Sequence, residues 1–259
     1  MKTITLNNGI EMPTLGYGVF QVSPKECERC VTDAIHTGYR LIDTAQAYYN
    51  EEGVGNAIVR LRVPRIDESL RKLRTDYIDL LLVHQPFGDY YGTYRAMQKA
   101  YQEGKVRAIG LSNFYGARFV DLAENMEVKP AVLQVEAHVF AQQTAMRETI
   151  APYGTRLMAW GPLAQGADNL FKDETLRGIG AKYGKSNAQI ALKFLTECAQ
   201  RTNEREFRNF RFRINGRRQK GNPPSGHRQV ESGPQRPCTG KVPFGLRQEF
   251  QSGQLIWPA

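Results

Sequence analysis

The sequence predicts an α/β fold of the (β/α)8 TIM-barrel type, incomplete, with about six recognisable barrel strands and an N-terminal β-hairpin. Short apolar runs alternate with amphipathic helical patterns between residues 15 and 195, as in a chain of βα units. Polar residues end nearly every apolar run, and barrel enzymes build their active sites at the carboxyl ends of their strands. No G-x-G-x-x-G follows an early strand, although an open dinucleotide-binding sheet would need one.

The strands are predicted from alternation and from uniform apolar runs. Residues 1–13 predict a hairpin, because Thr and apolar residues alternate on one side of the strong turn signal Asn8-Gly9. The apolar run at 78–83 is typical of a parallel strand that helices cover. We expect the barrel strands at residues 15–20, 40–43, 77–84, 106–112, 131–136 and 156–161.

The helices are predicted from apolar residues at helical spacing. The first has the clearest ends, because Ser23 and Pro24 suit the N-cap and first helical positions and Gly38 suits the residue after the end. We expect helices at residues 24–37, 51–59, 66–73, 91–103, 117–125, 142–151, 173–183 and 187–195.

Composition places the protein among soluble globular chains, with 41% hydrophobic and 24% charged residues in a length of 259. We expect no membrane span and no signal peptide, because no sufficiently long apolar run is present. The four cysteines lack regular spacing, which fits a reducing cytoplasm. Cys27 and Cys30 form a C-x-x-C inside a helical pattern, so we expect neither a metal nor a redox site.

The net charge of +9 is concentrated at one end of the chain. Residues 201–259 hold twelve Lys and Arg against four Asp and Glu, with almost no apolar periodicity. We therefore divide the chain into a barrel domain at 1–195 and a basic, low-order tail at 196–259, which has little to bury. A nucleic-acid-binding arm is an alternative interpretation of the tail, but aromatic stacking platforms are missing, so we expect no nucleic acid partner.

Several long segments resemble one enzyme family, in the order in which that family has them. They are Gly38–Ile58, Leu81–Pro86, Gly104–Phe114, Gln134–Glu136 and Ala159–Leu163. Together they resemble the aldo-keto reductases over roughly residues 1–195, and most of all the bacterial members that reduce small carbonyl compounds and keto-sugar acids. The resemblance implies a (β/α)8 barrel, NADPH as the cofactor, and hydride transfer to a small-molecule aldehyde or ketone.

The resemblance also assigns the catalytic residues. Tyr48 matches the acid that protonates the developing alkoxide, and His84 matches the residue that orients the carbonyl group. Asp43 matches a carboxylate that pairs with a catalytic lysine, which lowers the pKa of the tyrosine. Taken singly, Asp43 could be a helix cap and His84 a structural histidine; their joint placement on successive strand ends favours a site.

The remaining site residues follow from the same matches. Ser112, Asn113 and Gln134 match residues that hold the nicotinamide carboxamide, and Trp160 matches an aromatic that stacks on the ring. Gly161 and Leu163 continue that cofactor-binding segment. We expect an aromatic-lined substrate site from Phe20, Tyr49 and Phe87, and no metal. Which aldehyde or ketone is reduced and the oligomeric state are left open.

The chain departs from the family at two places. Directly after Arg65 the family's third strand, with its catalytic lysine, is missing, and after Leu195 the eighth strand and the clamp on the adenosine phosphate are missing. Without the lysine, a tyrosine is a weaker acid. Two functions therefore stay open: an NADPH-dependent carbonyl reductase, or a catalytically inactive remnant with at most residual nucleotide or small-ligand binding.

A frameshift near residues 196–197 is our hypothesis for the unusual tail. Under one choice of codons, residues 206–214 read one nucleotide later become Asn-Phe-Glu-Ile-Phe-Asp-Phe-Glu-Leu, which resembles the family's sequence after its Glu-Asn pair. The shift would account for the arginine excess and the missing periodicity together. Codons in the coding DNA that do not permit this second reading would end the hypothesis.

Overall fold

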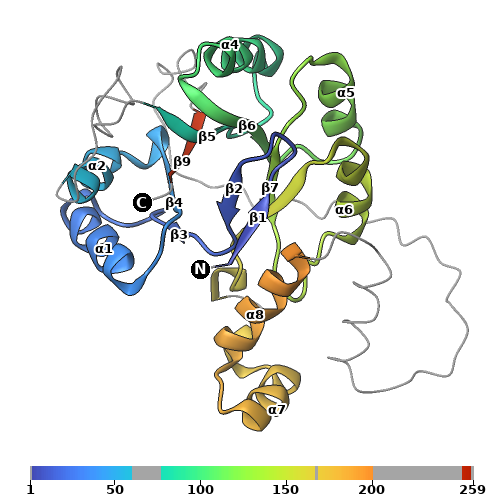
Figure 1. Ribbon diagram of the computed structural model, residues 1–259. Coiled ribbons are helices and arrows are strands. Elements are labelled where there is room, and N and C mark those ends of the chain that lie inside the picture. The colour runs from blue at the N-terminus through green and yellow to red at the C-terminus, as the bar shows by residue number, and fades with distance from the viewer. Residues whose placement is uncertain (1, 60–76, 167–168, 201–252, 258–259) are drawn as a thin grey trace, which may run out of the picture. The chain divides into compact units, whose positions relative to one another are not determined.

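The computed structural model describes residues 2–59, 77–166, 169–200 and 253–257. A separate two-stranded hairpin is formed by β1 (Thr3–Thr5) and β2 (Glu11–Pro13), which are antiparallel. Within the described residues, the main sheet has seven strands in the order β3-β4-β9-β5-β6-β7-β8 (Figure 1). Their bounds are Tyr17–Gly18 for β3, Ile42–Ala45 for β4, Ile78–Val83 for β5, Val106–Ser112 for β6, Val132–Glu136 for β7, Arg156–Trp160 for β8 and Gly253–Trp257 for β9.

Most of the sheet is built from consecutive βα units, which confirms the α/β fold. Strands β5, β6, β7 and β8 are parallel neighbours. Helix α4 (Tyr90–Gln102), α5 (Ala117–Asn125) and α6 (Thr144–Ile150) connect them in turn and lie on the outside of the sheet in Figure 1. A parallel pair needs such a crossover, because the chain must return to the same end of the sheet.

The other described helices are α1 (Pro24–Thr37), α2 (Glu51–Val59), α7 (Glu174–Tyr183) and α8 (Asn187–Gln200). The predicted bounds of α1, α2, α5 and β6 are confirmed to the residue. Helix α1 ends as expected, since Gly38 adopts a φ of 109° that favours glycine. The helix expected at 66–73 lies outside the described residues. No helix in the described ranges is long and apolar enough to cross a membrane.

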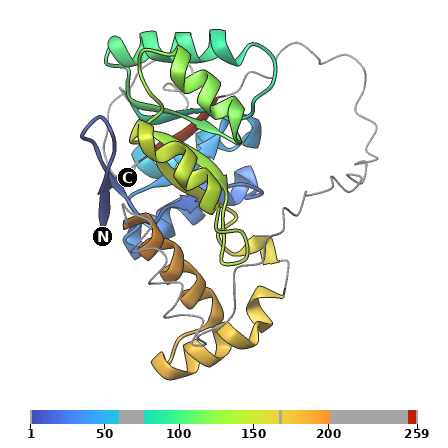
Figure 2. The same cartoon turned by 90° about the vertical axis from the view of Figure 1, so that its right-hand side faces the viewer.

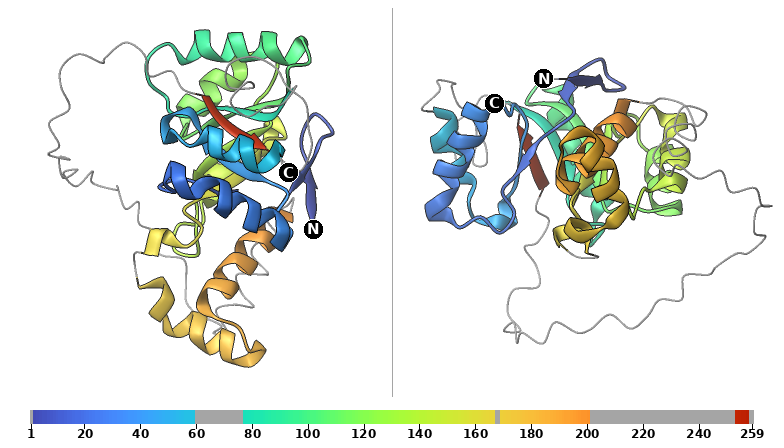
Figure 3. Two further views of the ribbon diagram at one scale, coloured as in Figure 1. Left: turned by 90° about the vertical axis from the view of Figure 1, so that its left-hand side faces the viewer. Right: turned by 90° about the horizontal axis from the view of Figure 1, so that it is seen from below.

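Strand β9 lies within the tail that the sequence predicts to be of low order. Residues 253–257 lie between β4 and β5 and pair antiparallel with both, and Figure 3 shows the strand, in red, from two further directions. The sequence carried no prediction of this strand. Helix α8 also extends past the expected end at Leu195. The predicted losses fall at residues 60–76 and 201–252, outside the described part, and stay predictions.

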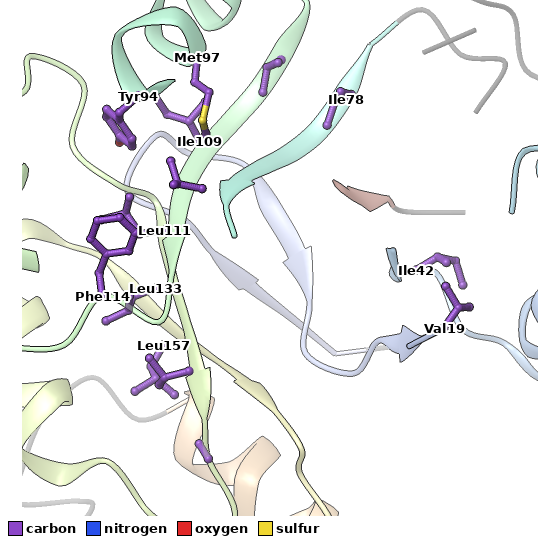
Figure 4. Close-up of a cluster of buried hydrophobic side chains, with 14 of the residues drawn as sticks. Val19, Ile42, Ile78, Tyr94, Met97, Ile109, Leu111, Phe114, Leu133 and Leu157 are labelled. Atoms are coloured by element: carbon purple, nitrogen blue, oxygen red, sulfur yellow. The ribbon is translucent and has the colours of Figure 1, made fainter. Parts of the chain in front are cut away.

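Buried apolar residues fill both faces of the sheet. On one face, Ile4 and Met12 of the hairpin pack with Leu41, Leu82 and Val132, and Figure 2 shows the hairpin at one end of the sheet. The other face packs against the helices, and Figure 4 shows part of this cluster. The hairpin therefore closes the end of the sheet at which the parallel strands begin.

Candidate active site

One cavity of about 830 Å³ extends from the hairpin to the carboxyl ends of the strands, and most of the predicted site residues line it. These residues come from β4, β6, β7 and β8 and from the segments that follow the strands. The predicted residues that line it are Phe20, Asp43, Tyr48, His84, Ser112, Asn113, Gln134, Trp160 and Gly161. Side chains that are up to 140 positions apart in the sequence thus face one space, where parallel strand ends meet.

Tyr48 and His84 lie next to each other in this cavity. Tyr48 ends the short 3-10 helix η1 (Gln46–Tyr48) that follows β4, and His84 directly follows β5. Their rings are 5.9 Å apart between centroids, edge to face at 79°. Phe20 packs on the other side of Tyr48 at 5.1 Å between centroids. A small molecule that reaches one of these two polar side chains can therefore reach the other.

Both side chains are neutral at neutral pH. Burial, together with the nearby carboxylate of Asp43, raises the pKa of the Tyr48 hydroxyl well above its ordinary value of 10. Burial lowers the pKa of the His84 imidazole below its ordinary value of 6.5. Tyr48 can thus donate a proton, and His84 can donate a hydrogen bond from its protonated ring nitrogen.

Asp43 is held by an amide side chain. Gln134 Nε2 donates a hydrogen bond to Asp43 Oδ2 at 3.0 Å, and Gln134 is 1% exposed. Among the described residues that line the cavity, Arg147 has the one permanently cationic side chain. Burial and then Asp43 therefore raise the pKa of the Tyr48 hydroxyl, and no lysine of the described lining lowers it.

Asn113 connects the wall of the cavity on the side of β6 and β8. Trp160 Nε1 donates to Asn113 Oδ1 at 2.9 Å, and Asn113 Nδ2 donates to Ser112 Oγ at 3.2 Å and to the His84 carbonyl at 3.3 Å. Asn113 has a φ of 63°, in the left-handed region that asparagine tolerates better than most residues. These bonds fix the plane of the Trp160 indole along the cavity wall.

The polar groups on this wall fit the nicotinamide end of a dinucleotide. A carboxamide needs one acceptor and one donor, and Gln134 Oε1 and the Ser112 hydroxyl can supply them. The flat indole of Trp160 suits ring stacking. The described lining residues therefore fit the ring end of the cofactor.

Three predicted site residues lie outside the lining of this cavity. Tyr49 and Phe87 are 74% and 68% exposed, and Leu163 packs beside the cluster of Ala164, Leu170, Leu176 and Ala191. Tyr49 also has a φ of 56°, in the left-handed region. Their assigned roles remain predictions.

Sequence reasoning missed one side of the cavity. Leu192, Leu195, Thr196 and Ala199 of α8 line it, and their i, i+3, i+4, i+7 spacing is a signal for a shared helix face. Arg147 of α6 also lines it, but inside a helix of mixed composition it carries no such signal. Cys27 lies elsewhere, buried in α1, where burial and then Cys30 raise its pKa to about 11. Within the described ranges, no three His, Cys, Asp or Glu residues gather as a metal site would require.

Comparisons with known proteins identify one enzyme family. The sequence pattern described as "Aldo/keto reductase family" matches residues 62–203. "Glyoxal reductase" of Bacillus subtilis is 41% identical over 216 residues, which cover 74% of this chain and 78% of that protein. "Methylglyoxal reductase DkgA" of Escherichia coli K12 is 35% identical over 214 residues, covering 74% and 78%. The alignment with the Bacillus subtilis protein is 216 positions long, which is more than the 74% of this 259-residue chain that it covers. That relative therefore has segments without a counterpart in this chain.

Solved structures agree in fold as well. An aldo/keto reductase from Brucella melitensis matches with a TM-score of 0.70 and 37% identity, covering 76% of this chain and 85% of that one. An aldo-keto reductase from a Medee basin deep-sea metagenome library gives a TM-score of 0.70, 36% identity and coverage of 76% and 81%. The chain therefore belongs to the aldo/keto reductase family, whose members are oxidoreductases built on a (β/α)8 barrel.

Proposed function

We propose that the protein reduces small aldehydes or ketones of the glyoxal class to alcohols, with NADPH as the hydride donor. The observation that carries this proposal is the placement of Tyr48 and His84 at 5.9 Å in one cavity with the residues suited to hold a nicotinamide. The names of the relatives, glyoxal reductase and methylglyoxal reductase, support the substrate class.

The cofactor, when bound, supplies the hydride that adds to the carbonyl carbon. The imidazole N–H of His84 donates a hydrogen bond to the carbonyl oxygen and sets its direction. The hydroxyl of Tyr48 gives its proton to the same oxygen as negative charge develops there. Trp160 and Asn113 hold the opposite wall in place, and Gln134 keeps Asp43 turned toward the strand ends.

The raised pKa of Tyr48 makes turnover slow and changes its pH dependence. A tyrosine with a pKa far above the working pH is a poor proton donor. It also stays protonated on the alkaline side, so we expect no loss of rate from its ionisation between pH 7 and 10. Because the pKa of His84 is lowered, its protonation affects the rate only below pH 6.5.

The test is an assay of NADPH oxidation with glyoxal or methylglyoxal, followed by absorbance of the reduced cofactor. We expect Tyr48→Phe to lower kcat at least about 100-fold, because it removes the proton donor. His84→Gln keeps an N–H donor and should lower kcat less. Tyr183→Phe is the matched control, since Tyr183 is 70% exposed on α7, away from the cavity.

Equal rates for the parent and Tyr48→Phe would place the activity elsewhere and refute the proposal. A second candidate function is cofactor binding without turnover, which the raised pKa of the Tyr48 hydroxyl favours. Quenching of Trp160 fluorescence by NADPH, with no oxidation of the cofactor by folded protein, would establish this second function. The measurement is repeated in Trp160→Phe, because the sequence contains one other tryptophan, Trp257.

A further inference from the structure

Strand β9 separates β4 and β5, the two strands that precede Tyr48 and His84 in the chain. Leu255 of β9 lies opposite Thr44 of β4 on one side and opposite Leu81 of β5 on the other. Ile256 lies likewise between Asp43 and Leu80. Figures 1 and 3 show the strand in this place. The extreme C-terminal part of the described chain thus lies directly beside the strand that bears a predicted site residue.

The width of one strand sets the separation of β4 and β5. Neighbouring strands lie about 4.8 Å apart, so β4 and β5 are about 10 Å apart with β9 between them. Tyr48 follows the end of β4 by three residues and His84 follows β5 directly. The edge-to-face contact of their rings therefore spans a gap whose size β9 determines.

Strand β9 also supplies most of the backbone pairing of β4. Four residues of β4 pair with β9, and only two pair with β3. Ile42, Thr44 and Ala45 are fully buried, where unpaired backbone groups are costly. Without β9, the strand β4 would have to leave its position or pair directly with β5, and either change moves Tyr48 relative to His84.

We propose that residues 253–257 act as a positioning strand, which inserts between β4 and β5 and holds Tyr48 and His84 at catalytic distance. The antiparallel direction fits a strand added from a distant part of the chain, because antiparallel pairing needs no crossover helix. The catalytic part rests on the proposed function; the insertion itself does not, and the two are tested by separate measurements.

The insertion is tested by hydrogen exchange in the full chain, read by mass spectrometry. The amides of residues 254–257 should be protected to the same extent as those of β5, because both edges of β9 are paired. Rapid exchange of 254–257 while β5 to β8 stay protected would overturn the proposal.

Leu255→Pro removes a ladder N–H and does not fit a central strand. We expect this variant to expose 253–257, β4 and β5 to exchange at least 10-fold faster, with β7 and β8 unchanged. Leu255→Val is the matched control and should keep the parent's protection, since valine suits strands. Protection of β4 and β5 that does not change in Leu255→Pro would also overturn the proposal.

A cross-link keeps the proposal testable if the proline variant fails to fold. Residues that face each other in antiparallel strands have Cα atoms about 4.5–5.5 Å apart, within the range of a disulfide. The double variant Leu81→Cys, Leu255→Cys should form this bond on mild oxidation. The control Leu81→Cys, Gly253→Cys is offset by two residues, because Gly253 faces Val83, and should not. Equal cross-linking in both variants would refute the register.

The positioning effect is read as a split between kcat and cofactor affinity. In Leu255→Pro we expect kcat to fall about 100-fold, as it does when catalytic groups are slightly misplaced. We expect the Kd for NADPH to change less than threefold, because the residues suited to the nicotinamide lie on β6, β7 and β8. A parallel loss of both would contradict positioning. A parent with protected β9 and no turnover would refute the proposed function and leave the insertion standing.

Discussion

The two sides of β9 are held together by different kinds of interaction. One side consists of β5 to β8, and we call it the ladder-rich side; the other consists of β3 and β4, and we call it the smaller side. On the ladder-rich side, neighbouring parallel strands of five to seven residues pair through three to five register positions each. On the other side, β3 pairs with β4 through Tyr17 and Gly18 alone. Figure 4 shows Val19 and Ile42 of that smaller side apart from the labelled residues of β5 to β8.

A buried asparagine compensates for the short ladder on the smaller side. Asn50 is 1% exposed; its Nδ2 donates to the carbonyls of Val19 at 2.9 Å and Val22 at 3.0 Å, and its Oδ1 accepts from Thr44 Oγ1 at 3.1 Å. One side chain thus connects β4 to the segment between β3 and α1. The comparison shows that longer backbone ladders join the strands of one side, whereas a buried polar side chain supplements a short ladder on the other.

The largest effect is expected at Gly110 in β6, on the ladder-rich side. A Cβ built there lies 2.4 Å from the carbonyl oxygen of Val132 and 2.7 Å from a methyl of Leu82. Backbone of a neighbouring strand cannot move aside cheaply, so Gly110→Ala should lower the free energy of unfolding by more than about 3 kcal/mol. Urea denaturation followed by circular dichroism measures it.

Gly18 in β3 provides the matched control on the smaller side. A Cβ at Gly18 meets nothing within 4 Å, and its backbone has no left-handed conformation. Gly18→Ala should therefore change the unfolding free energy by less than about 0.5 kcal/mol, or raise it slightly through the unfolded state. Equal losses for both alanine variants would mean that close packing does not distinguish the two sides.

The next largest effect is expected at Asn50. Asn50→Ala leaves two buried carbonyls and the Thr44 hydroxyl without this partner, which should cost about 2–4 kcal/mol. Asn125→Ala is the control, because Asn125 is exposed and donates one local bond, to the carbonyl of Asp121 at 2.8 Å. Thermal denaturation of both variants gives the comparison; a loss at Asn50 as small as at Asn125 would show that β3 and α1 hold without it.

The ladder-rich side could be predicted from the sequence because its signals are local. The uniformly apolar run of β5 and the helical spacing of α5 each lie within one segment, and the polar residues that follow the strands lie where a parallel sheet gathers them. Asp43, Tyr48, His84 and Trp160 were therefore placed in one cavity from motif positions alone.

Strand β9 could not be predicted in the same way. It is five residues long and pairs with strands that precede it by about 170 positions or more. A short apolar run does not indicate with which distant strand it pairs. Tyr49 and Phe87 show a second limit: the sequence gives the loop on which a side chain lies, but not whether that side chain lines the cavity or is exposed.

A smaller effect, dependent on pH, is expected at Asp79 in β5. Burial raises the pKa of this carboxyl from 3.8 to about 6, although Arg107 opposes the shift through an ion pair at 3.2 Å. Because this pKa is higher in the folded than in the unfolded state, protonation of Asp79 stabilises the folded protein. That contribution to the free energy of unfolding is complete below pH 3.8 and is lost as the pH rises through 6. We therefore expect the parent to lose about 1–3 kcal/mol of unfolding free energy from this group between pH 4 and 7.

Asp79→Asn removes that titration and should raise the stability at pH 7.5 relative to the parent. Urea melts at several pH values measure the difference between the two proteins. Asp33→Asn is the control, since Asp33 is exposed and paired with Arg29 at 3.4 Å, and its curve should follow that of the parent. A parent and Asp79→Asn whose stabilities run parallel from pH 4 to 7 would contradict the assigned pKa shift.

The smallest effect is expected at Tyr94 in α4, and it sharpens the comparison most directly. Tyr94 is fully buried on the ladder-rich side, and its hydroxyl donates to the carbonyl of Val128 at 3.1 Å. Tyr94→Phe keeps the ring packing and removes one neutral hydrogen bond, so the loss should be about 1 kcal/mol, against no change for the exposed Tyr183→Phe. Because β6 and β7 stay joined by their own backbone bonds, losing this side-chain bond should cost less than losing Asn50. A loss at Tyr94 that equals the loss at Asn50 would show that polar side chains matter alike on both sides of β9.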